Sequence, residues 1–411
     1  MSTVQFDTKY NWDKLEDKWY SYWLDKRYFH ADENSSKEPF TIIIPPPNVT
    51  GKLTMGHVLN NTIQDILIRK ARMEGKNACW IPGTDHASIA TESKVVAMLA
   101  EKGIEKSDLS REEFLNHAWQ WKEKYGGIII KQLKTLGCSC DWDRERFTMD
   151  EDYTNAIMHA FVELYNKDLI YKGKRLVNWC PVSKSAISDE EVIHQEKNGK
   201  LWYLRYPISN EDEFLTVATT RPETMLGDTA VAVNPSDKRY AHLVGKSVYL
   251  PLADREIPII FDELVNLDFG TGCVKVTPAH DPNDFEMGER HKLPFINIMN
   301  PDATLNREVP IKFQKLSREE ARKAVIKEMD AKGLLEKVED YTNNVGFSER
   351  GGVPIEYYLS DQWFMKMESL AKPASEAIKS GSIKFHPQHW VKTYHHWMEN
   401  IKDWCISRQL V

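Results

Sequence analysis

The sequence predicts an α/β protein in which a doubly wound parallel, Rossmann-like domain is interrupted by a mostly β domain. Near the amino-terminal end, a β-branched run, a long amphipathic helix and a second apolar run follow one another, as in a βαβ unit. Between about 190 and 342, short alternating runs separated by turn residues replace that pattern. A chain of 411 residues is also long for one hydrophobic core, which suggests two or three domains.

The first domain begins with aromatic residues at near-helical spacing within 1–39, which predict an amphipathic helix packed on the body. The run 40–44 predicts a buried strand that the prolines at 45–47 end. A helix is then predicted over 55–74, with Gly75 as its stop. Its apolar side chains fall on one face: Leu59, Ile63, Ile66 and Leu67.

The second strand of this unit is predicted over 78–81, and it leads into the loop 82–87. Open α/β sheets bind ligands at the carboxyl ends of their strands, so the loops after both strands are the predicted binding loops. The first loop ends in the string 54–57, Thr-Met-Gly-His, at a helix amino terminus, where backbone N–H groups and the helix dipole favour phosphate. The second loop offers Asp85, a carboxylate suited to a substrate ammonium. A glycine–histidine pair at a helix start also occurs in ordinary loops, so the pair alone identifies nothing.

The interrupting domain is predicted over 190–342, between a first part, 1–189, and a return to the first domain over 343–411. Its clearest helix is predicted over 316–336, where Ser317 and Glu320 have the spacing of a capping box. Six short runs predict its strands: 201–206, 214–218, 229–233, 248–250, 257–260 and 274–277.

Composition favours a soluble globular protein, with 41% apolar and 28% charged residues. Aliphatic runs such as 128–130 are too short to span a bilayer, and residues 1–7 lack the features of a signal peptide. A cytoplasmic location and no membrane partner are therefore expected. The net charge of −7 argues against a protein that wraps nucleic acid over its whole surface, although a local basic segment such as 171–175 still permits an RNA partner.

The six cysteines are scattered along the chain, and no CxxC pair occurs among them. The usual spacing of a zinc ribbon is therefore missing, and reduced, packed thiols are expected.

Several longer strings together resemble the valyl-tRNA synthetases, a family of class I enzymes. The strings 45–51 and 82–87 flank the Met-Gly-His string 55–57, which looks like the family's HIGH signature. The spacing of the three makes the resemblance specific, since isoleucyl relatives carry a GWDxHG-type loop where this chain has Gly-Thr-Asp-His. It covers essentially the whole chain, because matching strings continue at 178–181, 188–192, 219–224, 270–284, 360–364 and 403–409.

The resemblance implies ATP-dependent ligation of valine to its tRNA through a valyl-adenylate. Such catalysis rests on positioning and on stabilising charge that develops on phosphate. The implied partners are valine, ATP as its magnesium complex, and tRNA(Val), and a monomer is expected. The catalytic set is Thr54, Gly56 and His57 at the ATP phosphates. Valine and ATP are further assigned to Pro46, Asn48, Asp85 and His86, although ordinary loop shaping explains Pro46 and Asn48 equally well.

Two positions depart from the family pattern. Thr54 stands where the signature has its first histidine, and a hydroxyl is shorter and never cationic. Part of the phosphate contact is therefore expected to be weaker or supplied by water. The string 180–183, Cys-Pro-Val-Ser, stands where some relatives carry a CxxC zinc pair, so no structural metal is predicted there.

The resemblance further implies that 190–342 is an editing domain that hydrolyses threonyl-tRNA. A hydrophobic valine pocket rejects the added hydroxyl of threonine by only about a hundredfold, a value known for this very family of enzymes. The family's editing positions fall on Thr219, Arg221, Lys275, Thr277, Asp281 and Asp284. Asp284 is expected to hold the α-ammonium, and Thr277 or Lys275 to read the hydroxyl. Helix capping would also explain Asp281 and Asp284, and His280 is interpreted as a loop-packing residue rather than a base.

Two rival hypotheses remain. A free-standing trans-editing deacylase would lack a nucleotide loop in 1–189, and the string 55–57 argues against it. A non-catalytic paralogue that binds tRNA or ATP without turnover is compatible with Thr54. The family's second ATP signature, the KMSKS loop, and its anticodon-binding helices are absent from the sequence. The chain is therefore expected to be an amino-terminal portion that is inactive in aminoacylation by itself.

Overall fold

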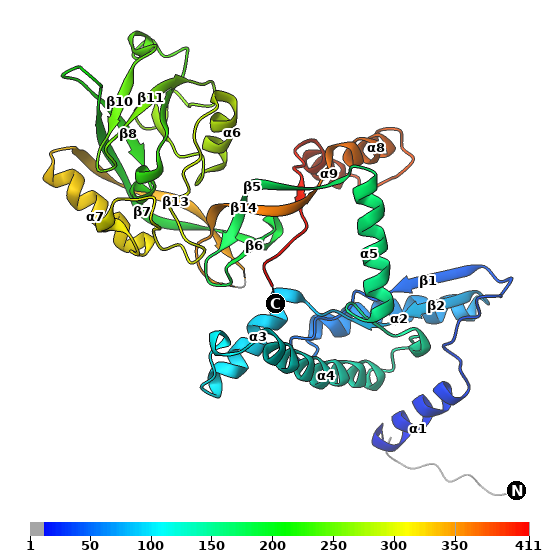
Figure 1. The fold of residues 1–411 in the computed structure, drawn as a ribbon. Coiled ribbons are helices and arrows are strands. Elements are labelled where there is room, and N and C mark those ends of the chain that lie inside the picture. The colour runs from blue at the N-terminus through cyan, green and yellow to red at the C-terminus, as the bar shows by residue number, and fades with distance from the viewer. Residues whose placement is uncertain (1–11, 350, 411) are drawn as a thin grey trace, which may run out of the picture. The chain divides into compact units, whose positions relative to one another are not determined.

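The computed structural model describes residues 12–349 and 351–410 (Figure 1). It divides into two compact units, the first of which runs to Glu163 and the second of which spans Leu164–Gln409. Each unit has hydrophobic cores of its own. In the part of the chain that the structure describes, no helix is long and apolar enough to cross a membrane.

The first unit opens with the predicted amphipathic helix, α1 (Trp12–Asp25). Its Tyr20 hydroxyl donates to the Cys138 carbonyl at 2.7 Å and accepts from the Trp142 indole N–H at 2.8 Å. The helix is therefore fastened to the segment 138–142, and the prediction that it packs on the body is confirmed.

The predicted βαβ unit is confirmed in β1 (Pro39–Ile43), α2 (Met55–Met73) and β2 (Asn77–Ile81). The two strands are parallel, with Phe40 opposite Ala78. A second, two-residue parallel pair joins β3 (Gly83–Thr84) to β4 (Arg146–Phe147). Among the described residues of the first unit, these two are the only parallel strand pairs, so the first unit is mixed α/β without a complete doubly wound sheet.

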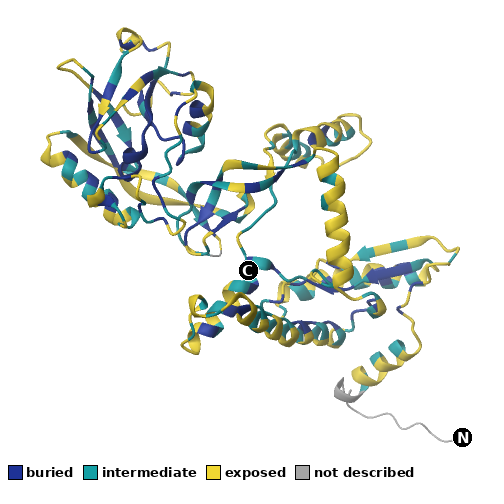
Figure 2. Ribbon diagram, in the orientation of Figure 1, coloured by how far each residue is buried: buried dark blue, intermediate teal, exposed yellow. Residues whose placement is uncertain are grey.

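The apolar face of α2 is exposed (Figure 2). Leu59, Ile63, Ile66 and Leu67 do share one face, yet Leu59 is 65% and Ile63 is 53% exposed. The opposite side of the helix supplies the buried Ile68 to the core. The sequence pattern specifies which face is apolar, but the burial of that face needs an element to cover it, and no described element of the first unit does so.

The remaining helices of the first unit surround a small second core of Val95, Leu99 and Phe114. They are α3 (Ser88–Glu101), η1 (Lys106–Asp108) and α4 (Arg111–Thr135), whereas Trp142 of η2 (Trp142–Arg144) packs against the core that contains Ile68. Helix α5 (Glu151–Asn166) leads from the first unit into the second.

The second unit contains three sheets. One has the order β15-β14-β5-β6: β5 (Ile170–Cys180), β6 (Ser185–Ile187), β14 (Glu356–Met365), β15 (Trp404–Cys405). Another has the order β13-β7-β8: β7 (Val192–Pro207), β8 (Phe214–Thr219), β13 (Leu335–Ser348). The third has the order β10-β11-β9-β12: β9 (Ala230–Val233), β10 (Ser247–Leu250), β11 (Arg255–Phe261), β12 (Cys273–Val276).

Helices flank these sheets. The α-helices of the second unit are α6 (Pro282–His291), α7 (Arg318–Ala331), α8 (Glu368–Lys379) and α9 (Trp390–Glu399). Its 3-10 helices are η3 (Asp189–Glu191), η4 (Pro222–Gly227), η5 (Ala241–Leu243) and η6 (Ile311–Phe313). The largest core of the chain joins β7, β8, η4, α7 and the third sheet.

Each of the six predicted strand runs corresponds to one of β7, β8, β9, β10, β11 and β12, although 229–233 begins one residue before β9 and 274–277 ends one residue after β12, and the predicted helix is α7. Its capping box is confirmed, since the Glu320 carboxylate accepts from the Ser317 N–H at 2.9 Å. The helix ends at Ala331 rather than near 336, because Gly333 takes a left-handed φ of +68° that turns the chain into β13.

The sequence prediction missed β13. This strand pairs antiparallel with β7 from Val192 opposite Ser348 to Leu204 opposite Leu335, and β5 pairs in the same way with β14. The run 336–344 is mostly exposed and polar, so no apolar alternation marked it. β7, which follows the sheet of β5 along the chain, therefore lies beside β13, which leads back to that sheet at β14 (Figure 1).

Candidate active and editing sites

The structure brings the two predicted binding loops together. The Val49 N–H donates to the Asp85 carbonyl at 3.0 Å, and the Asp85 N–H donates to the Pro47 carbonyl at 2.9 Å. Pro46 and Asn48, both exposed, thus lie on a strand-like stretch beside Asp85. This is the relation that a shared amino acid pocket needs.

The predicted phosphate string forms the amino terminus of α2. His57 occupies the third helical position after the N-cap Thr54, and its Nδ1 accepts from the Thr54 N–H at 3.1 Å. The same Nδ1 lies 2.8 Å from the Thr54 hydroxyl oxygen. A ring nitrogen that accepts from a backbone N–H carries no proton, so the proton of the neutral ring resides on Nε2. His57 is therefore arranged as a hydrogen-bond donor through Nε2. A Cβ added at Gly56 would meet only the Thr54 hydroxyl, at 3.7 Å, so the protein leaves the space in front of this backbone open.

The second loop is held by hydrogen bonds to Thr148, a residue that the sequence analysis did not single out. The Thr148 hydroxyl donates to Asp85 Oδ1 at 3.2 Å and lies 2.6 Å from His86 Nδ1. Asp85 Oδ1 also accepts from the Ala87 N–H at 2.8 Å. Ala87 has a left-handed φ of 51°, a conformation that costs a residue with a Cβ about 1–2 kcal/mol. The loop is thus fixed in shape, with Asp85 half-exposed.

The predicted editing residues come from three short stretches of the second unit. Thr219 ends β8, and Arg221 precedes η4. Lys275 lies in β12, and Thr277 is the first residue after that strand. The two aspartates, 281 and 284, open α6. Hydrogen bonds link Thr219 to Arg221, Lys275 to Thr277, and Thr277 to Asp284.

Lys275 and Thr277 belong to a buried polar network with members that the sequence analysis missed. Lys275 Nζ donates to the Thr277 hydroxyl at 2.6 Å and to the Thr224 hydroxyl at 2.8 Å. Asp228, which is completely buried, accepts from the Thr277 hydroxyl at 2.6 Å and from the Tyr206 hydroxyl at 2.7 Å. Burial raises the pKa of Asp228, while Lys275 acts to lower it.

Asp284 is nearly buried beside this network. Its Oδ2 accepts from the Thr277 N–H at 2.8 Å. Burial raises the pKa of Asp284 to about 8, and the carboxylate of Asp281 adds to the shift. Asp281 itself caps α6, because its side chain accepts from the N–H groups of Asn283 and Asp284. The capping interpretation is therefore correct for Asp281, whereas the carboxylate of Asp284 faces Thr277.

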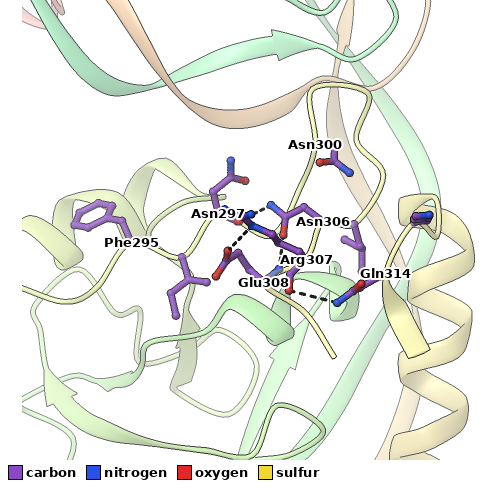
Figure 3. A pocket seen from close by; sticks show the side chains of 10 residues that line it. Phe295, Asn297, Asn300, Asn306, Arg307, Glu308 and Gln314 are labelled. Atoms are coloured by element: carbon purple, nitrogen blue, oxygen red, sulfur yellow. Dashed lines mark hydrogen bonds and ion pairs between the residues drawn. The ribbon is translucent and has the colours of Figure 1, made fainter. Parts of the chain in front are cut away.

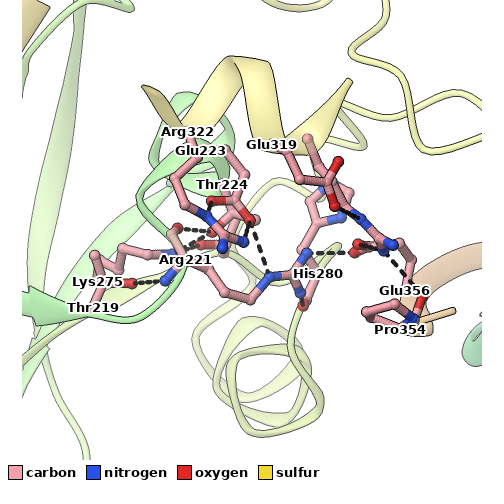
Figure 4. Close-up of polar contacts among 12 residues, drawn as sticks. Thr219, Arg221, Glu223, Thr224, Lys275, His280, Glu319, Arg322, Pro354 and Glu356 are labelled. Carbon is pink, nitrogen blue, oxygen red and sulfur yellow. Dashed lines mark hydrogen bonds and ion pairs between the residues drawn. The ribbon is translucent and has the colours of Figure 1, made fainter. Parts of the chain in front are cut away.

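Arg221 is held by a buried ion network (Figure 4). Its guanidinium pairs with Glu356 and lies 3.4 Å from Glu223. Arg322 binds Glu223 through two nitrogens at 2.8 and 2.9 Å, and Arg318 binds Glu356 at 2.6 Å. Burial acts to lower the pKa of Arg221, but the two carboxylates raise it on balance. Glu356 lies on β14, beyond the predicted end of the interrupting domain, so a residue of the return strand holds Arg221, a predicted editing residue.

His280 is buried, and its Nε2 accepts from the Ile298 N–H at 3.1 Å. Burial lowers its pKa to about 3, with Arg221 and Lys275 contributing. The ring is therefore neutral at physiological pH and hydrogen-bonded to backbone, as the loop-packing interpretation expects.

A cavity of about 560 Å³ lies in the loop region between α6 and α7 (Figure 3). It is lined by Phe295, Asn297, Asn306 and Gln314, among others, and by none of the predicted editing residues. Asn306 donates to the Asn297 carbonyl at 2.8 Å, and Gln314 donates to the Val309 carbonyl at 2.9 Å. These amides hold the loop itself in shape.

One group of side chains in the described ranges has the spacing of metal ligands: His30, Asp141 and Asp143. Asp141 already accepts from Arg144 at 3.0 Å, and Asp143 pairs with Arg27 at 2.8 Å. Arginine cations thus occupy both carboxylates, and the group is an ion-pair cluster that fastens residues 27–31 to 141–144.

At Cys180, burial raises the pKa of the thiol, but hydrogen bonds from Ser183 and Ser348 lower it on balance. The absence of a metal at this place stays a prediction.

The sequence model of the family described as tRNA synthetases class I (I, L, M and V) matches residues 18–411. Among curated relatives, the valine–tRNA ligase of Bacteroides fragilis is 58% identical over 407 residues, which are 99% of this chain and 46% of the relative. The valine–tRNA ligase of Christiangramia forsetii is 56% identical over 403 residues, which are 98% of this chain and 46% of the relative. That of Clostridium perfringens is 52% identical over 410 residues, which are 100% of this chain and 46% of the relative.

Among solved structures, a LeuRS–tRNA–LeuAMS ternary complex of Agrobacterium radiobacter K84 (agnB2) matches with a TM-score of 0.42 and 19% identity, over 85% of this chain and 49% of that chain. The chain spans a little less than half the length of the curated relatives that it matches. The family match, in contrast, extends over nearly all of this chain. The chain therefore belongs to the class I tRNA synthetases (I, L, M and V).

Proposed function

We propose that this chain takes part in the ATP-dependent ligation of valine to tRNA(Val) through a valyl-adenylate, and that its inserted domain hydrolyses threonyl-tRNA. The relatives that match the whole chain at more than half identity are described as valine–tRNA ligases, which supports the first part. The buried polar cluster around Thr277 supports the second.

In the proposed activation site, Pro46, Asn48, Asp85 and His86 line the valine and ATP pocket, and Thr54, Gly56 and His57 face the ATP phosphates. The reaction needs no protein nucleophile, because the valine carboxylate attacks the α-phosphate and pyrophosphate leaves. The Nε2–H of His57 donates to a phosphate oxygen, and that contact strengthens as charge develops. Magnesium, when bound with ATP, neutralises phosphate charge.

The doubly wound sheet is part of the same proposal. β1 and β2 are two of its parallel strands, and the exposed face of α2 is the surface that the rest of the domain covers. We further propose the boundaries 1–189, 190–342 and 343–411. The pairing of β7 with β13 supports them, since an inserted domain leaves and re-enters its host at adjacent points.

The observation that carries the editing proposal is the place of Thr277 between Lys275 and Asp284. Threonine bears its ammonium and its hydroxyl on adjacent carbons, so a site that reads both needs their binding groups side by side. Thr277 provides this, since its hydroxyl contacts Lys275 at 2.6 Å and its N–H contacts Asp284 at 2.8 Å. An ammonium that leaves water requires a carboxylate partner, and Asp284 is that partner. Water then attacks the ester carbonyl.

The test is Asp284→Ala in the full-length protein. We expect it to abolish hydrolysis of preformed threonyl-tRNA(Val) and to leave valine-dependent ATP–pyrophosphate exchange nearly intact, because Asp284 lies in the second unit and the phosphate string in the first. Asp340→Ala, which removes an exposed carboxylate of β13, is the control that should change neither activity. Undiminished deacylation by Asp284→Ala would place the ammonium elsewhere, and a parallel collapse of both activities would make Asp284 structural.

A further inference from the structure

Asp228 lies at the centre of the buried network beside the proposed editing pocket. None of its surface is exposed. Three hydrogen-bond donors surround its carboxylate: the Thr277 hydroxyl at 2.6 Å, the Tyr206 hydroxyl at 2.7 Å and the Lys275 ammonium at 3.4 Å. Thr277 is 1% and Lys275 is 8% exposed, so these two neighbours lie closer to the surface than Asp228, and any effect of its carboxylate on substrate choice must pass through one of them.

Thr277 is the neighbour through which it acts. A hydroxyl has one proton to donate and two lone pairs to accept with. An ionised carboxylate accepts only, so the Thr277 proton goes to Asp228. An ammonium donates only, so Lys275, at 2.6 Å, occupies one lone pair of the same oxygen. The Thr277 hydroxyl therefore donates to Asp228 and accepts from Lys275 before any ligand binds. One of its two lone pairs remains to accept a further hydrogen bond.

We propose that Asp228 is a specificity-determining positioning residue of the editing site. By taking the Thr277 proton it makes this side of the pocket an acceptor, which binds a side chain that carries a hydrogen-bond donor. The inference rests on the proposed editing function and deepens it. A threonyl ester supplies its hydroxyl proton to the remaining lone pair of Thr277. A valyl ester offers a methyl group there and leaves the buried acceptor unpaired, which disfavours it.

Tyr206 stabilises this arrangement. It is fully buried, and burial raises the pKa of its hydroxyl well above its usual value, with the nearby Asp228 carboxylate adding to the shift. The phenol therefore stays protonated and donates to Oδ2, while Thr277 and Lys275 both contact Oδ1. With both oxygens satisfied by donors, the carboxylate remains an acceptor toward Thr277 rather than rotating away from it.

The first experiment compares deacylation of threonyl-tRNA(Val) and valyl-tRNA(Val) by the full-length protein, and the readout is the ratio of the two kcat/KM values. We expect Asp228→Ala to lower this ratio by about tenfold or more, because the Thr277 proton becomes free to turn into the pocket. Asp228→Asn should keep the ratio within about threefold, since its amide oxygen still accepts from Thr277 and Lys275 while its NH₂ donates to Tyr206.

The matched control is Asp262→Ala. Asp262 is equally buried and pairs with Arg290 and with His291, the latter at 2.9 Å, but contacts none of the predicted editing residues. We expect its loss to lower stability and to leave the ratio unchanged. An Asp228→Ala protein that loses both deacylation rates equally, with the ratio kept, would overturn the proposal, because only a structural role predicts that result. A ratio that collapses in Asp228→Asn as it does in Asp228→Ala would overturn it as well.

A second experiment needs no variant and stands if Asp228→Ala does not fold. The wild-type protein is given tRNA(Val) esterified with the analogue of threonine in which fluorine replaces the hydroxyl. Fluorine is similar in size but donates no hydrogen bond, so we expect this ester to be hydrolysed as slowly as valyl-tRNA. Hydrolysis at the threonyl rate would overturn the proposal. A wild-type protein that hydrolyses none of these esters would instead refute the editing function itself.

Discussion

At the scale of single residues, the proposed editing pocket depends on side chains whose ionisation burial has changed. Asp284 is the clearest case, because its carboxyl is nearly buried and its pKa is raised to about 8. At neutral pH the free site therefore holds Asp284 mainly protonated. A substrate ammonium changes that balance, since an adjacent positive charge favours the ionised form.

This predicts a pH dependence. The kcat/KM for threonyl-tRNA deacylation should rise about tenfold from pH 6 to 7 and about fivefold from pH 7 to 8, because the free enzyme must lose the Asp284 proton to pair with the ammonium. Asp284→Asn should hydrolyse threonyl-tRNA slowly, and its kcat/KM should not rise over this pH interval. A wild-type profile that is flat over this interval would contradict the assignment of Asp284.

The same shift has a consequence for stability. The folded pKa lies above the unfolded value of 3.8, so the protonated carboxyl favours the folded state fully below about pH 4, and this contribution is lost as the pH rises toward 8. Denaturation of Asp284→Asn at pH 8 should therefore show a protein no less stable than the wild type, which separates a loss of function from a loss of fold.

At the scale of elements, the amino terminus of α2 explains how a threonine is accommodated where the family signature has a histidine. The backbone N–H of Thr54 holds His57 Nδ1 at 3.1 Å, and every residue except proline supplies such an N–H. The Thr54 hydroxyl adds a second contact at 2.8 Å but is not needed for the tautomer. The side chain at position 54 therefore does not decide which ring nitrogen of His57 carries the proton, and His57 remains a donor through Nε2.

Two substitutions in the full-length protein test this. His57→Ala should slow valine-dependent pyrophosphate exchange strongly, with the loss mainly in kcat, because the phosphate contact strengthens as charge develops. Thr54→His should leave the rate unchanged or faster. Equal slowing by both would show that the side chain at position 54 carries part of the contact.

Prediction from the sequence succeeded where a structural element depends on residues that are close together along the chain. The alternation in 201–206 marked part of β7, and the serine–glutamate spacing at 317 and 320 marked the start of α7. It failed at β13, whose exposed polar residues carry no apolar period. Predictions for Lys275, Thr277 and Asp284 came from resemblance, and the structure brings the three together. Asp228 and Glu356 were missed, because their roles arise from contacts through space with residues 49 and 135 positions away.

At the scale of the whole molecule, two compact units divide the proposed chemistry. The phosphate string lies in the first, and every predicted editing residue lies in the second. The first unit has a parallel pair of strands and an exposed apolar helix face rather than a finished sheet. The predicted editing residues, in contrast, belong to the unit that contains the largest hydrophobic cluster among the described residues.

This contrast predicts that the 411-residue chain alone does not make valyl-adenylate at a useful rate. Its sequence lacks the KMSKS signature that supplies further phosphate contacts in the family. Losing one well-placed donor typically costs about 3–4 kcal/mol of transition-state stabilisation. Valine-dependent pyrophosphate exchange by the purified chain, compared with the full-length protein, measures this. Exchange at a comparable rate would refute it, whereas exchange by neither protein would favour a non-catalytic paralogue.

The pairing of β7 with β13 also brings the two ends of the proposed inserted domain together. Val192 and Ser348 are direct partners across the ribbon, so everything between them starts and finishes at the width of one strand pair. A two-residue hairpin turn is enough to bridge such a gap. Replacing the residues between Val192 and Ser348 by such a turn is therefore expected to leave β5 paired with β14. Arg221 and Arg318, which both pair with Glu356 of β14, would be removed together, so the Glu356 carboxylate would lose both of these partners.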